Sequence, residues 1–167
     1  MDAAELRALQ APLKERYKAD PNAAVITLRA DGELGEGVSC SVETGRALVQ
    51  AGLHPATGGT GMEACSGDML LQALVACAGV TMRAVATALG IKIKSGRVMA
   101  EGDLDFRGTL GVAKDAPVGF RDIRLRFAVD VDAAPEQLDT LLRLTERYCV
   151  VFQTLKNTPQ LSARFNS

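Results

Sequence analysis

The stretch TGMEACSGDMLLQALVACAGVTMRAVATALG, residues 60–90, decides the fold of this chain. Its central part is almost free of charge, shows no strict alternation of apolar and polar residues, and is too long for one strand. The stretch therefore predicts a helix over residues 66–89, about 36 Å long at roughly 1.5 Å per residue. Ser66 is expected to cap its N-terminus, Asp68 suits the positive end of the helix dipole, and Gly90 suits the C-cap.

The predicted helix carries a cysteine, Cys77, in the middle of its apolar run. Because the run is apolar around most of the helix, most faces must be covered, and we expect a central core helix. Polar residues scattered along it favour a buried helix of a globular protein over a membrane span. The only basic one, Arg83, lies about 600° round the helix from Cys77, so a structural role is expected for it.

The bulk composition is that of a globular protein. The chain has 167 residues, of which 47% are apolar, enough for one domain with a sizeable core. A net charge of −1 gives no basic excess, so neither nucleic acid nor a membrane is an expected partner. No signal peptide is visible, because the N-terminus is charged from Asp2 on, and we expect a cytoplasmic protein with mostly free thiols.

The segments before the long helix predict a helix and a pair of strands. Residues 2–18 carry an apolar stripe at three- and four-residue spacing, which predicts a helix that kinks or restarts at Pro12. This N-terminal helical extension, over residues 1–20, has little core of its own, so it must pack on the domain or on a partner subunit. Residues 23–45 predict two strands around a turn.

The segments after the long helix predict further strands. Residues 91–110 suggest strands broken near Ser95-Gly96. Residues 120–132 alternate between apolar and charged side chains, which predicts a half-buried antiparallel strand whose charges are solvated.

A second main helix and a tail complete the chain. The helix starts near Pro135 and ends, or begins again as a short helix, at residues 149–152. The tail, residues 159–165, is compatible with a last edge strand. The order of elements predicts an α+β fold, a single domain over residues 1–167 with two main helices on a mostly antiparallel sheet.

Four cysteines, at positions 40, 65, 77 and 149, form no CxxC pair, so neither a zinc site nor a thioredoxin-type motif is indicated. Cys40 in an alternating strand and Cys65 at the helix entrance are expected to fill space. Cys77 and Cys149 each occupy an apolar position of a main helix, and spacing alone leaves both a filling and a catalytic role open. No cofactor and no metal are expected.

The connection over residues 44–61 is rich in glycine and carries Arg46 and the only histidine, His54. It holds no GxxxxGK[ST] pattern and no lysine, so a phosphate-binding loop is not expected. His54 is expected at the surface. A metal site joining His54 to Cys65 or Cys40 would match no familiar ligand spacing.

Two motifs are similar to those of the OsmC/Ohr family. SGDMLLQALVACAGVTMRAVA, residues 66–86, resembles the family's signature of an acid, two leucines, an alanine run, a cysteine and a Thr-Met-Arg-like segment. TERYCVVFQTL, residues 145–155, resembles the segment around the family's second cysteine. The resemblance spans roughly residues 58–165 and is closer to the generic OsmC-like branch than to the Ohr branch.

The resemblance implies an OsmC-like fold, an intertwined homodimer with two long central helices between sheets and its sites at the subunit interface. It implies a thiol peroxidase for organic hydroperoxides, with Cys77 as peroxidatic and Cys149 as resolving cysteine. An external dithiol would then reduce the resulting disulfide. The family also uses an arginine held by an acid, for which Arg46, then Arg29, and Asp68 are the candidates here.

Two questions stay open at this level. Asp68 lies nine residues before Cys77, on the opposite face of a regular helix at roughly 13 Å, so it serves Cys77 indirectly or only as an acid at a helix N-terminus. Val150, Phe152 and Gln153 depart from the family pattern after the second cysteine. The rival interpretation is a catalytically silent OsmC-like dimer that binds a small apolar ligand or acts as a redox-responsive protein.

Overall fold

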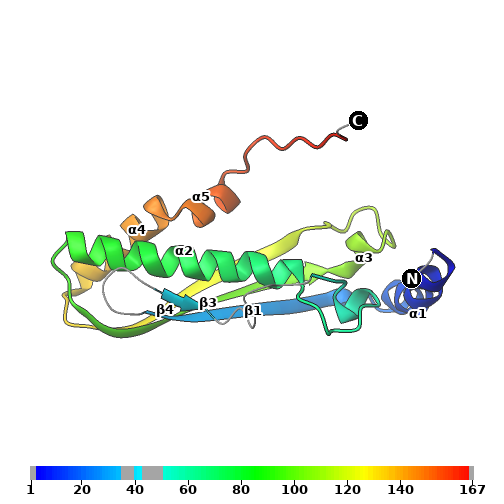
Figure 1. Cartoon of the computed structure of the whole chain (residues 1–167), viewed down its shortest axis with the longest axis horizontal. Helices are drawn as coiled ribbons and strands as arrows, with labels where there is room; N and C mark the ends of the chain where they lie inside the picture. The colour runs from blue at the N-terminus through cyan, green and yellow to red at the C-terminus, as the bar shows by residue number, and fades with distance from the viewer. Residues whose placement is uncertain (1–2, 35–39, 43–50, 166–167) are drawn as a thin grey trace.

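A computed structural model of the chain describes residues 3–34, 40–42 and 51–165. Figure 1 shows an elongated molecule in which a long helix lies between a sheet and a pair of shorter helices. The architecture is therefore α+β, with the long helix at its centre, as the sequence predicts.

The sheet has four antiparallel strands in the order β2-β1-β3-β4. The strands are β1 (Val25–Leu34), β2 (Cys40–Val42), β3 (Ile93–Asp105) and β4 (Phe120–Val131). Leu34 of β1 lies opposite Cys40 of β2, which confirms the predicted strand pair. Arg46 lies outside the described residues.

Helix α2 (Ser66–Ala88) is the predicted central helix. It packs on one face of the sheet and carries much of the core, with Leu71, Leu74, Val75, Ala78, Met82 and Ala86 all buried. By length and hydropathy α2 would also fit a membrane span, yet it is the core helix between the sheet and α4 with α5 (Figure 1).

The ends of α2 differ slightly from expectation. The N-cap residue is Cys65, whose side chain makes no capping bond, and Ser66 is already the first helical residue. At the other end, Leu89 is the cap and Gly90 follows with a φ of 70°, the left-handed conformation that glycine adopts without strain. Each boundary thus moved by one residue.

The predicted break near Ser95-Gly96 is wrong, because β3 is one continuous strand with a register irregularity between Ile93 and Ser95. Gly96 serves packing there: a Cβ on it would lie 2.8 Å from Val129 Cγ1. The strand ends earlier than predicted, at Asp105. The buried Asp105 carboxylate accepts from the Arg107 backbone N–H at 3.1 Å and caps the short helix α3 (Phe106–Thr109).

The charges on β4 are paired across strands rather than simply solvated, which corrects the prediction. The Arg124 guanidinium donates to Asp103 at 2.7 Å and to Asp122. These hydrogen bonds hold the pKa of the Asp103 carboxyl down at about 2. The side of the sheet away from α2 is therefore held by ion pairs.

The N-terminal helix α1 (Ala3–Ala19) runs through Pro12 as one helix and does not restart. It packs on the domain, because the Tyr17 hydroxyl donates to the Ala56 carbonyl at 2.7 Å, in the 3₁₀ turn η2 (Pro55–Thr57). A second 3₁₀ turn, η1 (Pro21–Ala24), connects α1 to β1.

The C-terminal part contains α4 (Pro135–Tyr148) and α5 (Val150–Lys156), separated by Cys149. This confirms that the second helix ends and begins again near residues 149–152. The tail over 159–165 is not a strand, contrary to the edge-strand prediction. It leaves the body beyond α5, with Leu161 and Phe165 exposed (Figure 1).

Candidate functional site: a pair of thiols between three helices

The structure brings Cys77 and Cys149 together. Cys77 lies in the middle of α2 and is half-buried, whereas Cys149 is 1% exposed at the bend between α4 and α5. Both are free thiols, and the Cys149 thiol donates a hydrogen bond to the Cys77 sulfur. Two sulfurs that are 72 positions apart in the chain (149 − 77) are therefore direct neighbours.

The bend at Cys149 determines which groups face the thiols. Cys149 has extended backbone angles, φ −71° and ψ 108°, so it interrupts the helix between Tyr148 and Val150. Its sulfur accepts from the backbone N–H of Phe152 at 3.5 Å. The first backbone N–H groups of α5, which a continuous helix would use internally, are thereby free to face sulfur.

The pKa of Cys77 is lowered by these neighbours. Burial raises the pKa of the thiol, but hydrogen bonds from the backbone N–H of Val151, the Cys149 thiol, the backbone N–H of Val150 and the Thr81 hydroxyl lower it by more. Donors that face a thiolate favour the charged form. Cys77 is therefore the member of the pair that ionises first.

Cys149 shows the opposite shift. The pKa of its thiol is raised to about 11, mainly by burial and also by the neighbouring Cys77, although the backbone N–H groups of Phe152 and Val151 lower it. When the pair loses one proton, Cys77 therefore becomes the thiolate and Cys149 stays protonated as its hydrogen-bond donor. Such a pair provides one nucleophile and one proton donor.

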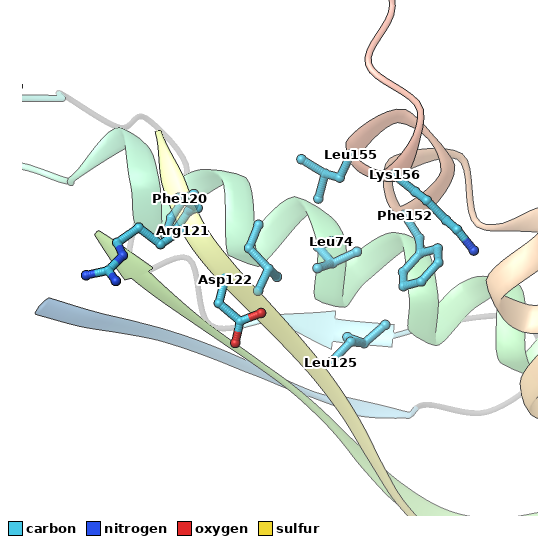
Figure 2. A pocket seen from close by; sticks show the side chains of 9 residues that line it. Leu74, Phe120, Arg121, Asp122, Leu125, Phe152, Leu155 and Lys156 are labelled. Atoms are coloured by element: carbon cyan, nitrogen blue, oxygen red, sulfur yellow. The ribbon is translucent and has the colours of Figure 1, made fainter. Parts of the chain in front are cut away.

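A cavity of about 320 Å³ has mostly apolar walls, which also include Arg121, Asp122 and Lys156, and one wall is Leu74, one helical turn before Cys77. Figure 2 shows Leu74 of α2 near the Phe152 ring and Leu155 of α5, with Leu125 on β4. Leu74 precedes Cys77 by three residues, and Phe152 follows Cys149 by three, so cavity and thiols share the same faces of α2 and α5. The guanidinium of Arg121 points away from the apolar side chains in Figure 2.

The predicted acid lies apart from the thiols, at the N-terminal end of α2. Burial raises the pKa of the Asp68 carboxyl, and the electrostatic interaction with His54 lowers it by less. The electrostatic neighbour of Asp68 is therefore His54, and its role toward Cys77 stays a prediction. Arg46 lies outside the described residues, so its predicted role also stays untested.

Arg83 has the structural role that the sequence predicts. Its guanidinium donates to the Ile93 carbonyl at 2.9 Å and to the Leu34 carbonyl at 3.4 Å. These bonds tie α2 to the ends of β3 and β1. Arg29 lies on β1 opposite Glu101 of β3, but its side chain lies outside the described part of the structure, so its predicted role also stays untested.

His54 is half-buried and structural rather than a surface residue as expected. Its Nδ1 accepts from the Ala56 backbone N–H at 3.0 Å and caps η2, and its ring stacks on Phe106 at 5.1 Å. His54 and Cys65 line a second cavity of about 380 Å³ at this end of α2. Within the described residues, no three His, Cys, Asp or Glu side chains gather in a set that would hold a metal ion.

Sequence reasoning missed three of the groups that face Cys77. Thr81 follows Cys77 by four residues, so a search for polar side chains on the same helix face would have found it. The backbone N–H groups of Val150 and Val151 carry no such signal, because their direction depends on the backbone angles at Cys149.

Comparison with known proteins identifies the family. The family model for OsmC-like proteins matches residues 59–164, and no curated protein matches the chain. The fold resembles that of an OsmC-like hydroperoxide resistance protein from Jannaschia sp. CCS1, with 16% identity over 86% of this chain and 95% of that chain, at a TM-score of 0.61. It also resembles an OsmC-like protein from Mycoplasma pneumoniae, with 17% identity over 80% of this chain and 86% of that chain, at a TM-score of 0.56. Since the model covers more than half of the chain, the protein belongs to the OsmC-like family.

Proposed function

We propose that the protein is a thiol-dependent peroxidase that reduces organic hydroperoxides through Cys77 and Cys149. One observation carries the proposal: the two free thiols are hydrogen-bonded to each other, the pKa of Cys77 is lowered and that of Cys149 is raised. Family membership supports it, because the family includes a protein described as a hydroperoxide resistance protein.

The proposed reaction has three steps. The Cys77 thiolate attacks the terminal oxygen of ROOH, the O–O bond breaks, and RO⁻ takes a proton and leaves as an alcohol. The sulfur of Cys149 attacks the Cys77 sulfenic acid, which releases water and forms a disulfide. An external dithiol reduces this bond by two exchanges and is itself oxidised to a disulfide. In sum, one hydroperoxide and one dithiol give one alcohol, one water and one disulfide.

The cavity beside Cys77 supports an organic rather than an inorganic peroxide. Its walls are mostly apolar side chains, including Leu74, Phe152 and Leu155. Each alkyl CH₂ group buried there would add about 0.8 kcal/mol to binding. An alkyl or aryl hydroperoxide therefore gains affinity that hydrogen peroxide lacks.

The working unit that we propose is a homodimer. Three large apolar side chains of α2, Met69, Leu70 and Val80, remain 37–39% exposed in the single chain. An apolar face of this kind on a central helix indicates a surface that a second copy covers. Arg46 as the activating cation, Asp68 as its acid, and a reducing compartment such as the cytoplasm complete the proposal.

The test is steady-state consumption of cumene hydroperoxide with a dithiol reductant. We expect turnover by the unchanged chain and none by Cys77→Ser, since serine does not provide a thiolate. Cys65→Ser, which replaces a half-buried thiol elsewhere on the chain, is the control and is expected to keep full activity. Peroxide consumption by Cys77→Ser at the rate of the unchanged chain would refute the proposal and leave the rival interpretation, a silent ligand-binding dimer.

A further inference from the structure

The bend between α4 and α5 frees backbone donors at the thiols. In a continuous helix, the N–H of Val150 would donate to the Glu146 carbonyl, and the N–H of Val151 to the Arg147 carbonyl. The helical pattern instead stops with Cys149, whose N–H donates to the Thr145 carbonyl at 2.9 Å. The next two N–H groups turn to the Cys77 sulfur.

The Glu146 carbonyl, which has no backbone donor at the bend, accepts a hydrogen bond from a side chain instead. The Gln153 Nε2 donates to the Glu146 carbonyl at 2.8 Å, the position that the Val150 N–H would occupy in a straight helix. The backbone N–H of Gln153 resumes the helical pattern by donating to the Cys149 carbonyl at 2.9 Å. The Gln153 side chain thus supplies the hydrogen bond that the Glu146 carbonyl at the end of α4 would otherwise lack. The backbone N–H of Val150 is then available to the Cys77 sulfur.

The amide of Gln153 is itself held in place. Its Oε1 accepts from Asn157 Nδ2 at 3.0 Å, which leaves Nε2 directed at the Glu146 carbonyl. Asn157 is the C-cap residue of α5 and is exposed. A short chain of hydrogen bonds therefore runs from the end of α5 back to the last turn of α4.

We propose that Gln153 is a positioning residue that holds the α4–α5 bend and so keeps the N–H groups of Val150 and Val151 on the Cys77 sulfur. Without its side chain, the Glu146 carbonyl lacks a donor, and a straighter helix that recovers the Val150 N–H becomes favourable. A straighter helix would move the backbone N–H groups of Val150 and Val151 away from the Cys77 sulfur. The inference deepens the proposed function, since these amides act on the thiol that would attack the peroxide.

The experiment measures the pH dependence of Cys77 alkylation by iodoacetamide, followed by mass spectrometry of the peptide that contains Cys77. We expect Gln153→Leu to raise the pH midpoint by about one unit and to slow alkylation at pH 7 about tenfold. Gln137→Leu is the matched control, because Gln137 also bonds a backbone group of α4, accepting from the Ala134 N–H at 3.0 Å. We expect no change in its midpoint.

A second variant keeps the test decisive if Gln153→Leu does not fold. Asn157→Ala removes an exposed side chain and only loosens the Gln153 amide, so a shift in the same direction of roughly twofold in rate is expected. Midpoints of Gln153→Leu, or of Asn157→Ala where only that variant folds, equal to that of Gln137→Leu would overturn the inference. Alkylation needs no peroxide, so an absence of peroxide turnover in the unchanged chain would count against the proposed function alone.

Discussion

Two half-buried cysteines, Cys77 in the middle of α2 and Cys65 at its N-cap, lie in different surroundings. In the middle of the helix, Cys77 receives hydrogen bonds from α5, from Cys149 and from Thr81. At the N-terminal end, Cys65 occupies the N-cap position without a side-chain capping bond, near Asp68, whose electrostatic neighbour is His54. The comparison shows that a bend in a neighbouring helix supplies donors in addition to Thr81 on the helix that carries the thiol.

The largest expected difference between the surroundings of Cys77 and those of Cys65 concerns the turnover of hydroperoxide. Cys149→Ser should strongly slow dithiol-dependent turnover, because the sulfenic acid formed on Cys77 then has no thiol within the chain to condense with and must react with the external dithiol directly. The first oxidation should still occur, so dimedone should label Cys77 after one equivalent of cumene hydroperoxide. Cys65→Ser is the control at the other region and should retain turnover without dimedone labelling. Full turnover by Cys149→Ser would remove the resolving role and with it the contrast.

The next difference concerns the Thr81 hydroxyl. Thr81→Val keeps the side-chain shape but removes one hydrogen-bond donor to the Cys77 sulfur. The pKa of Cys77 should therefore rise, and alkylation of Cys77 at pH 7 should slow about three- to tenfold. Because only the thiolate reacts, the loss should disappear well above the pKa, which a pH profile of alkylation checks. Below pH 9, Cys149 should remain unreactive, since its pKa is about 11.

The control for Thr81→Val is Thr87→Val on the same helix. The Thr87 hydroxyl donates to the Arg83 carbonyl at 2.9 Å, so this variant removes a hydroxyl that faces the helix backbone. Equal pH profiles for the two variants would show that the hydroxyl at position 81 does not act on the sulfur.

The smallest expected effect is that of Asp68→Asn. With burial raising the pKa of this carboxyl, the ionised form is less stable in the folded chain than in the unfolded one. Asp68→Asn should therefore have a slightly higher melting temperature than the unchanged chain at pH 7. This difference in melting temperature should vanish near pH 3, where Asp68 is protonated. Cys77 alkylation should change less than about twofold, by comparison with the tenfold that one pKa unit represents.

Glu136→Gln, which removes an acid from the first turn of α4, is the control for this variant. A tenfold slower alkylation of Cys77 in Asp68→Asn alone would instead place Asp68 in the thiol site. It would also erase the contrast between the two regions.

The sequence was most informative where one physical pattern dominates. The apolar run around Cys77 predicted α2 to within one residue at each end, and the alternation over residues 120–132 predicted β4. An end or restart of the second main helix near residues 149–152 was also predicted, although Cys149 itself was placed on that helix rather than between α4 and α5. In each case local periodicity and burial agree, so the pattern is unambiguous.

Other features depend on contacts that the sequence does not display. Glycine is typical of turns, but Gly96 lies inside β3. A glycine is needed at this position because the neighbouring strand leaves no room for a side chain. Arg124 of β4 pairs with Asp103 of β3, a contact that only the strand register reveals. The donors from Val150 and Val151 arise from two backbone angles at Cys149, which no residue type specifies.

The most direct test of the account is a map of the disulfide formed by peroxide. The reduced protein would be treated with one equivalent of cumene hydroperoxide, alkylated under denaturing conditions and digested, and linked peptides would be identified by mass spectrometry. The account predicts a bond between Cys77 and Cys149 within one chain, with Cys65 alkylated. Two free thiols at positions 77 and 149, or a bond from Cys77 to another cysteine, would contradict it.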